Sequence, residues 1–136
     1  MKILAFQKAL EAIPFKSFPI QLKGIGMFPN EKNVRVVWVG CQSKNKELEM
    51  LAEKINTALA KDISGISRFK KEEFAGHITI ARVKKRGEKK LNLKDFLQKH
   101  KNDDFGSFTC NSFELKQSVL QRTGPVYSMI RRFEGK

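Results

Sequence analysis

The chain has little cysteine and no long apolar segment. Of its 136 residues only Cys41 and Cys110 are cysteines, and they lack the short paired spacing of a metal site. Two isolated cysteines favour free thiols in a reducing compartment over a disulfide or a zinc site. No apolar run approaches the ~20 residues that cross a bilayer, and the start lacks the apolar stretch of a signal peptide. These absences predict a cytoplasmic protein without a structural metal.

Acidic residues are scarce relative to basic ones. Lysine and arginine number 27 against 14 aspartates and glutamates, which gives a formal net charge of +13. This excess predicts attraction to polyanions, and nucleic acid is the natural partner. The alternative is a basic surface that serves only solubility or ion pairing, as in heat-adapted proteins, although ion pairing alone would favour balanced charge. With 40% apolar residues and 11 phenylalanines, we expect one folded domain over residues 1–136.

Apolar periodicity predicts three helices. Apolar residues three and four apart favour a short helix from Ile3 to Ile13, ended near Pro14, and a longer helix over residues 45–60. A third, short helix is expected over residues 91–97. The dense basic run 84–90 is either a solvated loop or a flap that contacts RNA.

Alternating and β-rich segments predict strands between these helices. They cover residues 18–23, 34–40, 77–83, 105–110, 113–120 and 126–130. Gly124-Pro125 is expected to form the turn of a closing hairpin. Gly24 and Gly26 are read as strand glycines that permit a bulge or close packing, because no third glycine or helix start follows as in a phosphate loop. The mixture predicts an α+β fold.

The stretch around His77 carries the chemistry. His77 and Thr79 alternate with Ile78 and Ile80, so on a strand the imidazole and the hydroxyl share one face and the isoleucines lie on the opposite, buried face. An imidazole can transfer a proton near neutral pH, and a nearby hydroxyl can bind the same phosphate or orient the ring. The alternative is an interior histidine that makes only a structural hydrogen bond.

Residues 76–83, Gly-His-Ile-Thr-Ile-Ala-Arg-Val, do not stand alone. One further segment precedes it in the chain, Lys23–Asn30 running into Val34–Gly40, and two follow it, Asp104–Phe108 and then Glu114–Ser118 with Gly124–Tyr127. In this order, the four segments together resemble those of the 2H phosphoesterases, specifically the RNA 2′,3′-cyclic phosphodiesterase group, also called 2′-5′ RNA ligases or LigT-like proteins. The resemblance implies an α+β, LigT-like bilobal fold, in which antiparallel sheets line a central cleft and helices pack outside.

The resemblance also implies a reaction. Such enzymes open RNA 2′,3′-cyclic phosphates to 2′-phosphates without a metal or other cofactor, and reversible 2′-5′ ligation can use the same site. One histidine activates the attacking group, another protonates the leaving oxygen, and threonines hold the phosphate. On this chain His77 and Thr79 take the catalytic roles. Arg82 is the expected substrate-binding residue, although strict alternation places it opposite Thr79 unless the strand bulges. The implied partners are RNAs with 2′,3′-cyclic phosphate ends, including tRNA fragments.

One departure from the family is clear. The family has two His-x-Thr-x motifs, whereas this chain has one. The other histidine, His100, lacks a hydroxyl two positions on and is expected to be a solvated surface residue. We therefore expect the chain to be N-terminally incomplete relative to the family, without the first motif. A complete member is expected to be a monomer, and uncovered strands would allow this chain to dimerise.

Two other functions remain open at this point. The chain could be a non-catalytic basic RNA-binding module derived from the family, in which case His77→Ala would leave RNA binding unchanged. It could also be a 2H enzyme that acts on a small cyclic nucleotide rather than on RNA.

Overall fold

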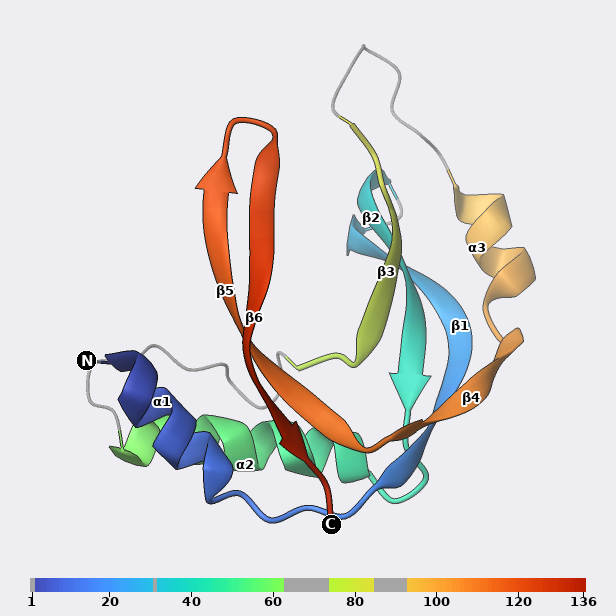
Figure 1. Cartoon of the computed structure of the whole chain (residues 1–136). Coiled ribbons are helices and arrows are strands. Elements are labelled where there is room, and N and C mark those ends of the chain that lie inside the picture. The colour runs from blue at the N-terminus through green and yellow to red at the C-terminus, as the bar shows by residue number, and fades with distance from the viewer. Residues whose placement is uncertain (1, 31, 63–73, 85–92) are drawn as a thin grey trace. The chain divides into compact units, whose positions relative to one another are not determined.

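The computed structural model describes residues 2–30, 32–62, 74–84 and 93–136 (Figure 1). Its elements follow in the order α1 (Lys2–Glu11), β1 (Phe18–Asn30), β2 (Asn33–Gln42), α2 (Glu47–Asp62), β3 (His77–Arg82), α3 (Lys94–His100), β4 (Asp104–Cys110), β5 (Ser112–Gln121) and β6 (Gly124–Glu134). This mixture confirms the predicted α+β class. Of the predicted basic run, residues 85–90 lie outside the described ranges. Within those ranges, every helix falls short of the length and apolar content that membrane crossing requires.

The chain divides into two compact units. One, which we call the ribbon unit, comprises Met1–Phe18, Glu49–Glu73 and Thr109–Lys136, and holds α1, most of α2, β5 and β6. The other, the sheet unit, comprises Pro19–Leu48 and Phe74–Phe108, and holds β2, β3, α3 and most of β1 and β4. That residues 1–136 form a single domain stays a prediction.

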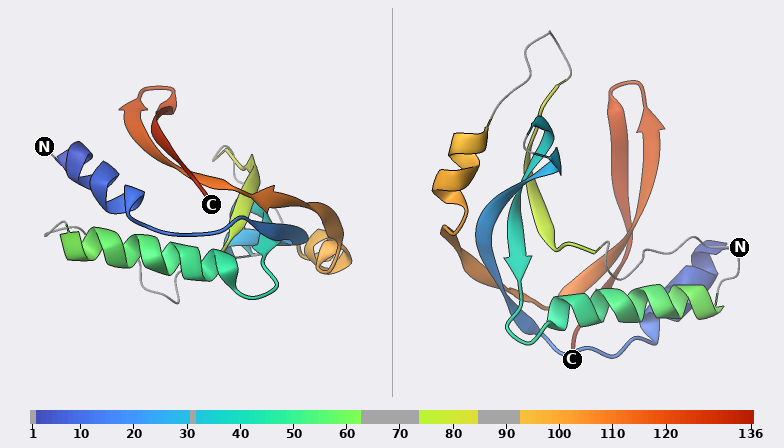
Figure 2. Two further views of the ribbon diagram at one scale, coloured as in Figure 1. Left: turned by 60° about the horizontal axis from the view of Figure 1, so that its bottom comes forward. Right: turned by 180° about the vertical axis from the view of Figure 1, so that it is seen from behind.

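The sheet unit is built on a four-stranded sheet in the order β3-β2-β1-β4 (Figure 2). β2 pairs antiparallel with both β1 and β3. Apolar residues of β1 and β2 form a buried cluster: Ile25, Met27, Val34, Val37 and Val39. Leu93 and Leu97, just before and within α3, pack against this cluster, so α3 helps to cover it. Each such side chain stabilises the fold by at most about 1.5–3 kcal/mol through burial.

In the ribbon unit, β5 and β6 form an antiparallel hairpin paired from Ser112↔Glu134 to Gln121↔Gly124. The turn residues are Arg122 and Thr123, so the turn predicted at Gly124-Pro125 is wrong. Gly124 instead closes the turn with a φ of +124°, a conformation that glycine adopts readily. Pro125 lacks an N–H, which is tolerated near the start of an edge strand.

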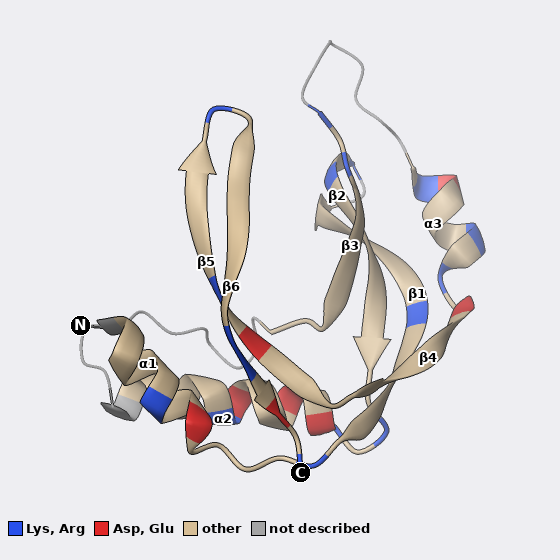
Figure 3. Cartoon of the chain, in the orientation of Figure 1, with Lys and Arg blue, Asp and Glu red and all other residues tan. Residues whose placement is uncertain are grey.

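The base of this hairpin is packed, and its far part is exposed. The Phe113 and Phe133 rings stack at 5.1 Å, and Phe133 is buried. Beyond them the exposed apolar side chains are Val119, Leu120, Val126, Tyr127 and Met129. Residues 117–121 and 124–130 carry no charge, so Arg122 in the turn is the charged residue at this end (Figure 3). The far part of the hairpin therefore exposes apolar side chains to solvent.

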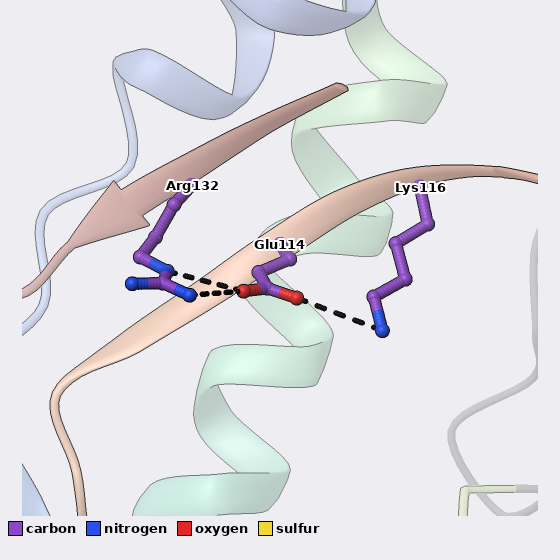
Figure 4. Close-up of polar contacts among 3 residues, drawn as sticks. All are labelled: Glu114, Lys116 and Arg132. Atoms are coloured by element: carbon purple, nitrogen blue, oxygen red, sulfur yellow. Dashed lines mark hydrogen bonds and ion pairs between the residues drawn. The ribbon is translucent and has the colours of Figure 1, made fainter. Parts of the chain in front are cut away.

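A charged cluster joins the two strands of the hairpin near its base. The Glu114 carboxylate on β5 accepts hydrogen bonds from Arg132 Nε at 3.1 Å and Nη2 at 2.8 Å on β6, and Lys116 Nζ lies 3.6 Å away (Figure 4). These cations favour the ionised carboxylate, so the hydrogen bond from Arg132 in particular lowers the pKa of Glu114 from its ordinary value of 4.5.

Candidate active site

Strand pairing in the sheet unit decides which predicted site residues share a face. Alternate residues of β2 point to the same side of the sheet, and three of them are Val36, Trp38 and Gly40. Their direct partners on β3 are, in the same order, Arg82, Thr79 and His77. Since directly opposed residues of neighbouring strands lie on one face, the three predicted site residues share one face of the sheet. We call this side of the sheet the site face.

A β-bulge makes this arrangement possible. Thr79 and Arg82 are three residues apart, so a regular strand would place them on opposite faces. The register shifts between Val37 and Trp38 of β2, where β3 has one extra residue, Ile80. The extra residue reverses the alternation beyond it and returns Arg82 to the site face. The sequence had left this placement conditional on a bulge.

The His77 imidazole is held by one hydrogen bond. Its Nδ1 lies 2.7 Å from the Ala75 carbonyl oxygen. A carbonyl can only accept, so Nδ1 carries the proton of this hydrogen bond, and in the neutral form of the ring Nε2 is then the unprotonated nitrogen. Among the described residues Nε2 has no hydrogen-bond partner, and the residue is exposed. His77 is therefore arranged to accept a proton at Nε2.

Two aromatic rings of the site face lie against the imidazole. The Phe28 ring of β1 meets it edge-on, at 5.2 Å between centroids and 87° between planes. The Trp38 indole lies 5.9 Å away at 59°, and Phe28 and Trp38 are 5.1 Å apart. Sequence reasoning missed both rings, because neither strand's own alternation shows that the side chains converge on β3.

The rest of β3 differs from the expectation of a buried apolar face. Ile78 is 42% exposed and Ile80 is 55% exposed. β3 is an edge strand, and the buried cluster centres on β1 and β2 instead. The prediction that these isoleucines are buried is wrong.

His100 takes no part in this site face. It ends α3, its Nδ1 lies 2.6 Å from Asp103 Oδ2, and its ring packs 4.6 Å from that of Phe96. Its side chain is 29% exposed, so His100 is half-buried, whereas the sequence had predicted a solvated surface residue.

A separate groove of about 420 Å³ lies in the sheet unit. It is lined by Pro19, Gln21, Gln42, Ser43, Lys44 and Ser107. Gln42 lies two residues beyond Gly40 on β2, and it pairs with Gln21, so both belong to the site face. At its edge the Asp104 carboxylate accepts hydrogen bonds from Gly106 N and Gln21 Nε2, which lower the pKa of Asp104 from 3.8. Sequence reasoning did not single out Gln42, but counting two residues on from Gly40 along β2 would have placed it on the site face.

The described part of the chain offers little support for a metal site or a cysteine nucleophile. There, no group of three or more histidine, cysteine or acidic side chains is placed to hold a metal ion. Cys41 and Cys110 are both free, and burial raises the pKa of each thiol. Raised thiol pKa values disfavour the reactive thiolate, so neither cysteine is suited to act as a nucleophile.

Comparisons with known proteins identify the family of this chain. A family model described as the AKAP7 2′5′ RNA ligase-like domain matches residues 3–134. The chain is 35% identical to an RNA 2′,3′-cyclic phosphodiesterase of Archaeoglobus fulgidus, over 98% of this chain and 71% of that one. It is 37% identical to a protein of the same name from Methanocaldococcus jannaschii, over 84% of this chain and 62% of that one.

Solved structures share the fold. A crystal structure from Thermus thermophilus matches with a TM-score of 0.71 at 24% identity, over 98% of this chain and 70% of that one. Escherichia coli LigT complexed with 3′-AMP matches with a TM-score of 0.67 at 21% identity, over 98% of this chain and 68% of that one. These likenesses confirm the predicted LigT-like fold and the resemblance seen in four sequence segments. The chain belongs to the 2′5′ RNA ligase-like family of 2H phosphoesterases.

Proposed function

We propose that this chain opens RNA 2′,3′-cyclic phosphates to 2′-phosphates, with His77 transferring a proton, Thr79 holding a phosphate oxygen and Arg82 binding the phosphate charge. The observation that carries the proposal is the unpartnered His77 Nε2 on the same sheet face as Thr79 and Arg82. The relatives' shared name, RNA 2′,3′-cyclic phosphodiesterase, supports the reaction class.

The reaction needs two proton transfers. Water adds to phosphorus, the bond from phosphorus to O3′ breaks, and the phosphate stays on O2′. The water loses a proton, and O3′ gains one. Neutral His77 can accept the first proton at Nε2, or protonated His77 can donate the second. The sequence has one His-x-Thr motif, so the other transfer falls to a different group or to solvent. Since a positioned acid or base contributes ~10²–10⁴ in rate, we expect slow turnover.

The residues that share the face of His77 suit an anionic phosphate group. Thr79 is half-buried next to Trp38, which limits its freedom and lets its hydroxyl donate a directed hydrogen bond. Arg82 is exposed and has no ion pair in the described part of the chain, so its guanidinium is available for bidentate phosphate contact. The groove with Lys44 would hold the RNA chain that leads to the cyclic phosphate.

With an RNA 5′-hydroxyl in place of water, the same step run on the cyclic phosphate would form a 2′-5′ phosphodiester. The proposal includes this ligation, RNA partners such as tRNA fragments, and a cytoplasmic setting. A non-catalytic RNA-binding module remains the second candidate, supported by the net charge of +13.

The deciding experiment measures hydrolysis of a cyclic-phosphate-ended oligonucleotide in the presence of a chelator. We expect His77→Ala to lower kcat at least ~100-fold without weakening RNA binding, because a proton-transfer group is lost. His100→Ala is the matched control and should keep full turnover, since His100 lies outside the site face. Equal turnover in the wild type and His77→Ala would contradict the catalytic role. Salt-sensitive RNA binding with no turnover in any of them would favour the binding module.

A further inference from the structure

Two glycines leave room on the site face where other residues would place side chains. A Cβ built at Gly26 of β1 would overlap three ring carbons of Trp38, Cζ2, Cη2 and Cε2. Gly26 is absent from the glycines with positive φ, so its backbone does not itself require glycine. The requirement at this position is space, because the indole lies directly on the Gly26 backbone.

Gly40, the partner of His77 on β2, also leaves space where a side chain would otherwise lie. A Cβ there would lie 2.6 Å from the Lys23 carbonyl oxygen and 3.7 Å from Trp38 Cζ3. The indole thus reaches from Gly26 to the edge of Gly40. The imidazole has no side chain opposite it on β2, and it packs against the rings of Trp38 and Phe28 instead.

The indole is held by packing alone. Trp38 Nε1 is buried and has no hydrogen-bond partner within the described ranges. A buried donor without a partner is destabilising, so this orientation depends on the shape of its surroundings. Any change at Gly26 that lifts the indole would be transmitted directly to His77.

The imidazole needs such support. Rotation about the Cβ–Cγ bond of histidine is broad and roughly two-fold, and a flipped ring would exchange the positions of its nitrogen and carbon atoms. The hydrogen bond from Nδ1 to Ala75 opposes the flip. The edge-on Phe28 ring and the tilted indole pack against the imidazole and further limit its rotation.

We infer that Trp38 and Phe28 are positioning residues that hold the His77 imidazole with Nε2 toward the substrate, and that Gly26 provides the space in which Trp38 does so. The catalytic consequence rests on the proposed function; the ring orientation does not. None of the three residues touches the phosphate in this role. Their effect on the reaction is exerted through His77.

The test is a mutant cycle of Gly26→Ala, Trp38→Val and the double variant, with Trp38→Phe as the conservative control. Nitrogen-15 NMR of the His77 ring reports its tautomer without any need for turnover, and a His100→Gln background leaves one histidine to assign. We expect one dominant tautomer in the wild type and in Trp38→Phe, and a mixture in Gly26→Ala and in Trp38→Val. Adding Gly26→Ala to Trp38→Val should change nothing further, because the clashing indole is gone.

Turnover gives an independent measure. Gly26→Ala and Trp38→Val should lower kcat by about 10- to 100-fold with KM nearly unchanged, since a small misplacement of a catalytic group has this effect. Trp38→Phe should restore most of kcat. Phe28→Leu keeps the test usable if Gly26→Ala does not fold, because it removes a ring contact without adding bulk. A single unchanged tautomer in Trp38→Val and Phe28→Leu would overturn the inference, even if turnover fell. A wild type with no turnover but the expected tautomer changes would overturn only the proposed function.

Discussion

The four-stranded sheet buries apolar side chains under α3, whereas the β5–β6 ribbon leaves apolar side chains exposed on both of its faces. In the sheet unit, Val37 is 7% exposed and Val39 is 8% exposed. In the ribbon, Leu120 is 85% exposed and Tyr127 is 62% exposed, and Val126 on the opposite face is 51% exposed. Both regions have strand-forming sequences rich in apolar residues, so the local sequence alone does not explain the difference.

The number of packed layers explains it. A two-stranded hairpin is marginally stable by itself, and its faces become buried only when another element covers them. The sheet unit has four strands and receives Leu93 and Leu97 from the α3 region. With one face supplying the stability, the opposite face can hold glycines, two aromatic rings and His77. The comparison therefore separates residues that stabilise the sheet from residues that serve the site.

The largest effect should come from charging the buried face of the sheet. Val37→Asp places a carboxyl within the apolar cluster without a partner, and we expect it to cost about 3–5 kcal/mol in the free energy of unfolding. Val126→Asp is the matched control, because the same change on the exposed ribbon should cost less than about 0.5 kcal/mol. Urea denaturation of both variants measures the difference. Equal losses would mean that the ribbon is covered in solution.

A smaller effect is expected on self-association. Open strand edges and exposed apolar residues predict that the ribbon promotes contact between two copies of the chain. Leu120→Ser should weaken the association constant about tenfold or more, since full burial of a leucine contributes about 1.5–3 kcal/mol. Sedimentation velocity over a range of concentrations measures it, with Gln117→Ser as the control on the same strand. A chain that stays monomeric at all concentrations would remove the basis for this prediction.

The alternation of side chains along β3 correctly predicted the part of the site that lies within this single strand. The two-residue period of a strand is fixed by backbone geometry, so His77 and Thr79 were correctly expected to share a face. The same rule failed for Ile78 and Ile80, because burial depends on what packs over an edge strand. The sequence does not contain that information locally.

The remaining features depend on two strands at once. Arg82 reaches the site face only through the bulge at Ile80, and a register shift is a property of the β2–β3 pair. Gly26 was correctly read as a position for close packing, but its partner, Trp38, comes from the neighbouring strand. Convergence of the rings on His77 could be seen only once the register of three strands was known.

The smallest expected effects concern two carboxylates, one in each unit. Glu114 in the ribbon unit and Asp104 in the sheet unit both have lowered pKa values. Above their ordinary values of 4.5 and 3.8 both are ionised in the folded and the unfolded chain, and their stabilising contributions are complete. As the pH falls through each folded pKa, the unfolded chain has already bound the proton, so stability decreases. Glu114→Gln and Asp104→Asn should each reduce the loss of folding stability that occurs as the pH falls.

Salt should distinguish the two carboxylates. Glu114 interacts mainly with the charged groups of Arg132 and Lys116, whereas the main partners of Asp104 are the neutral Gly106 N–H and Gln21 amide. Because dissolved ions screen exposed charges, high salt should reduce the effect of Glu114→Gln and leave that of Asp104→Asn nearly unchanged. Thermal unfolding between pH 5.5 and 3, at about 0.1 M and 1 M salt, measures both, these being conditions with Debye lengths of about 10 and 3 Å. An equal salt response in the two variants would mean that Arg132 acts on Glu114 chiefly through hydrogen-bond geometry rather than through its charge.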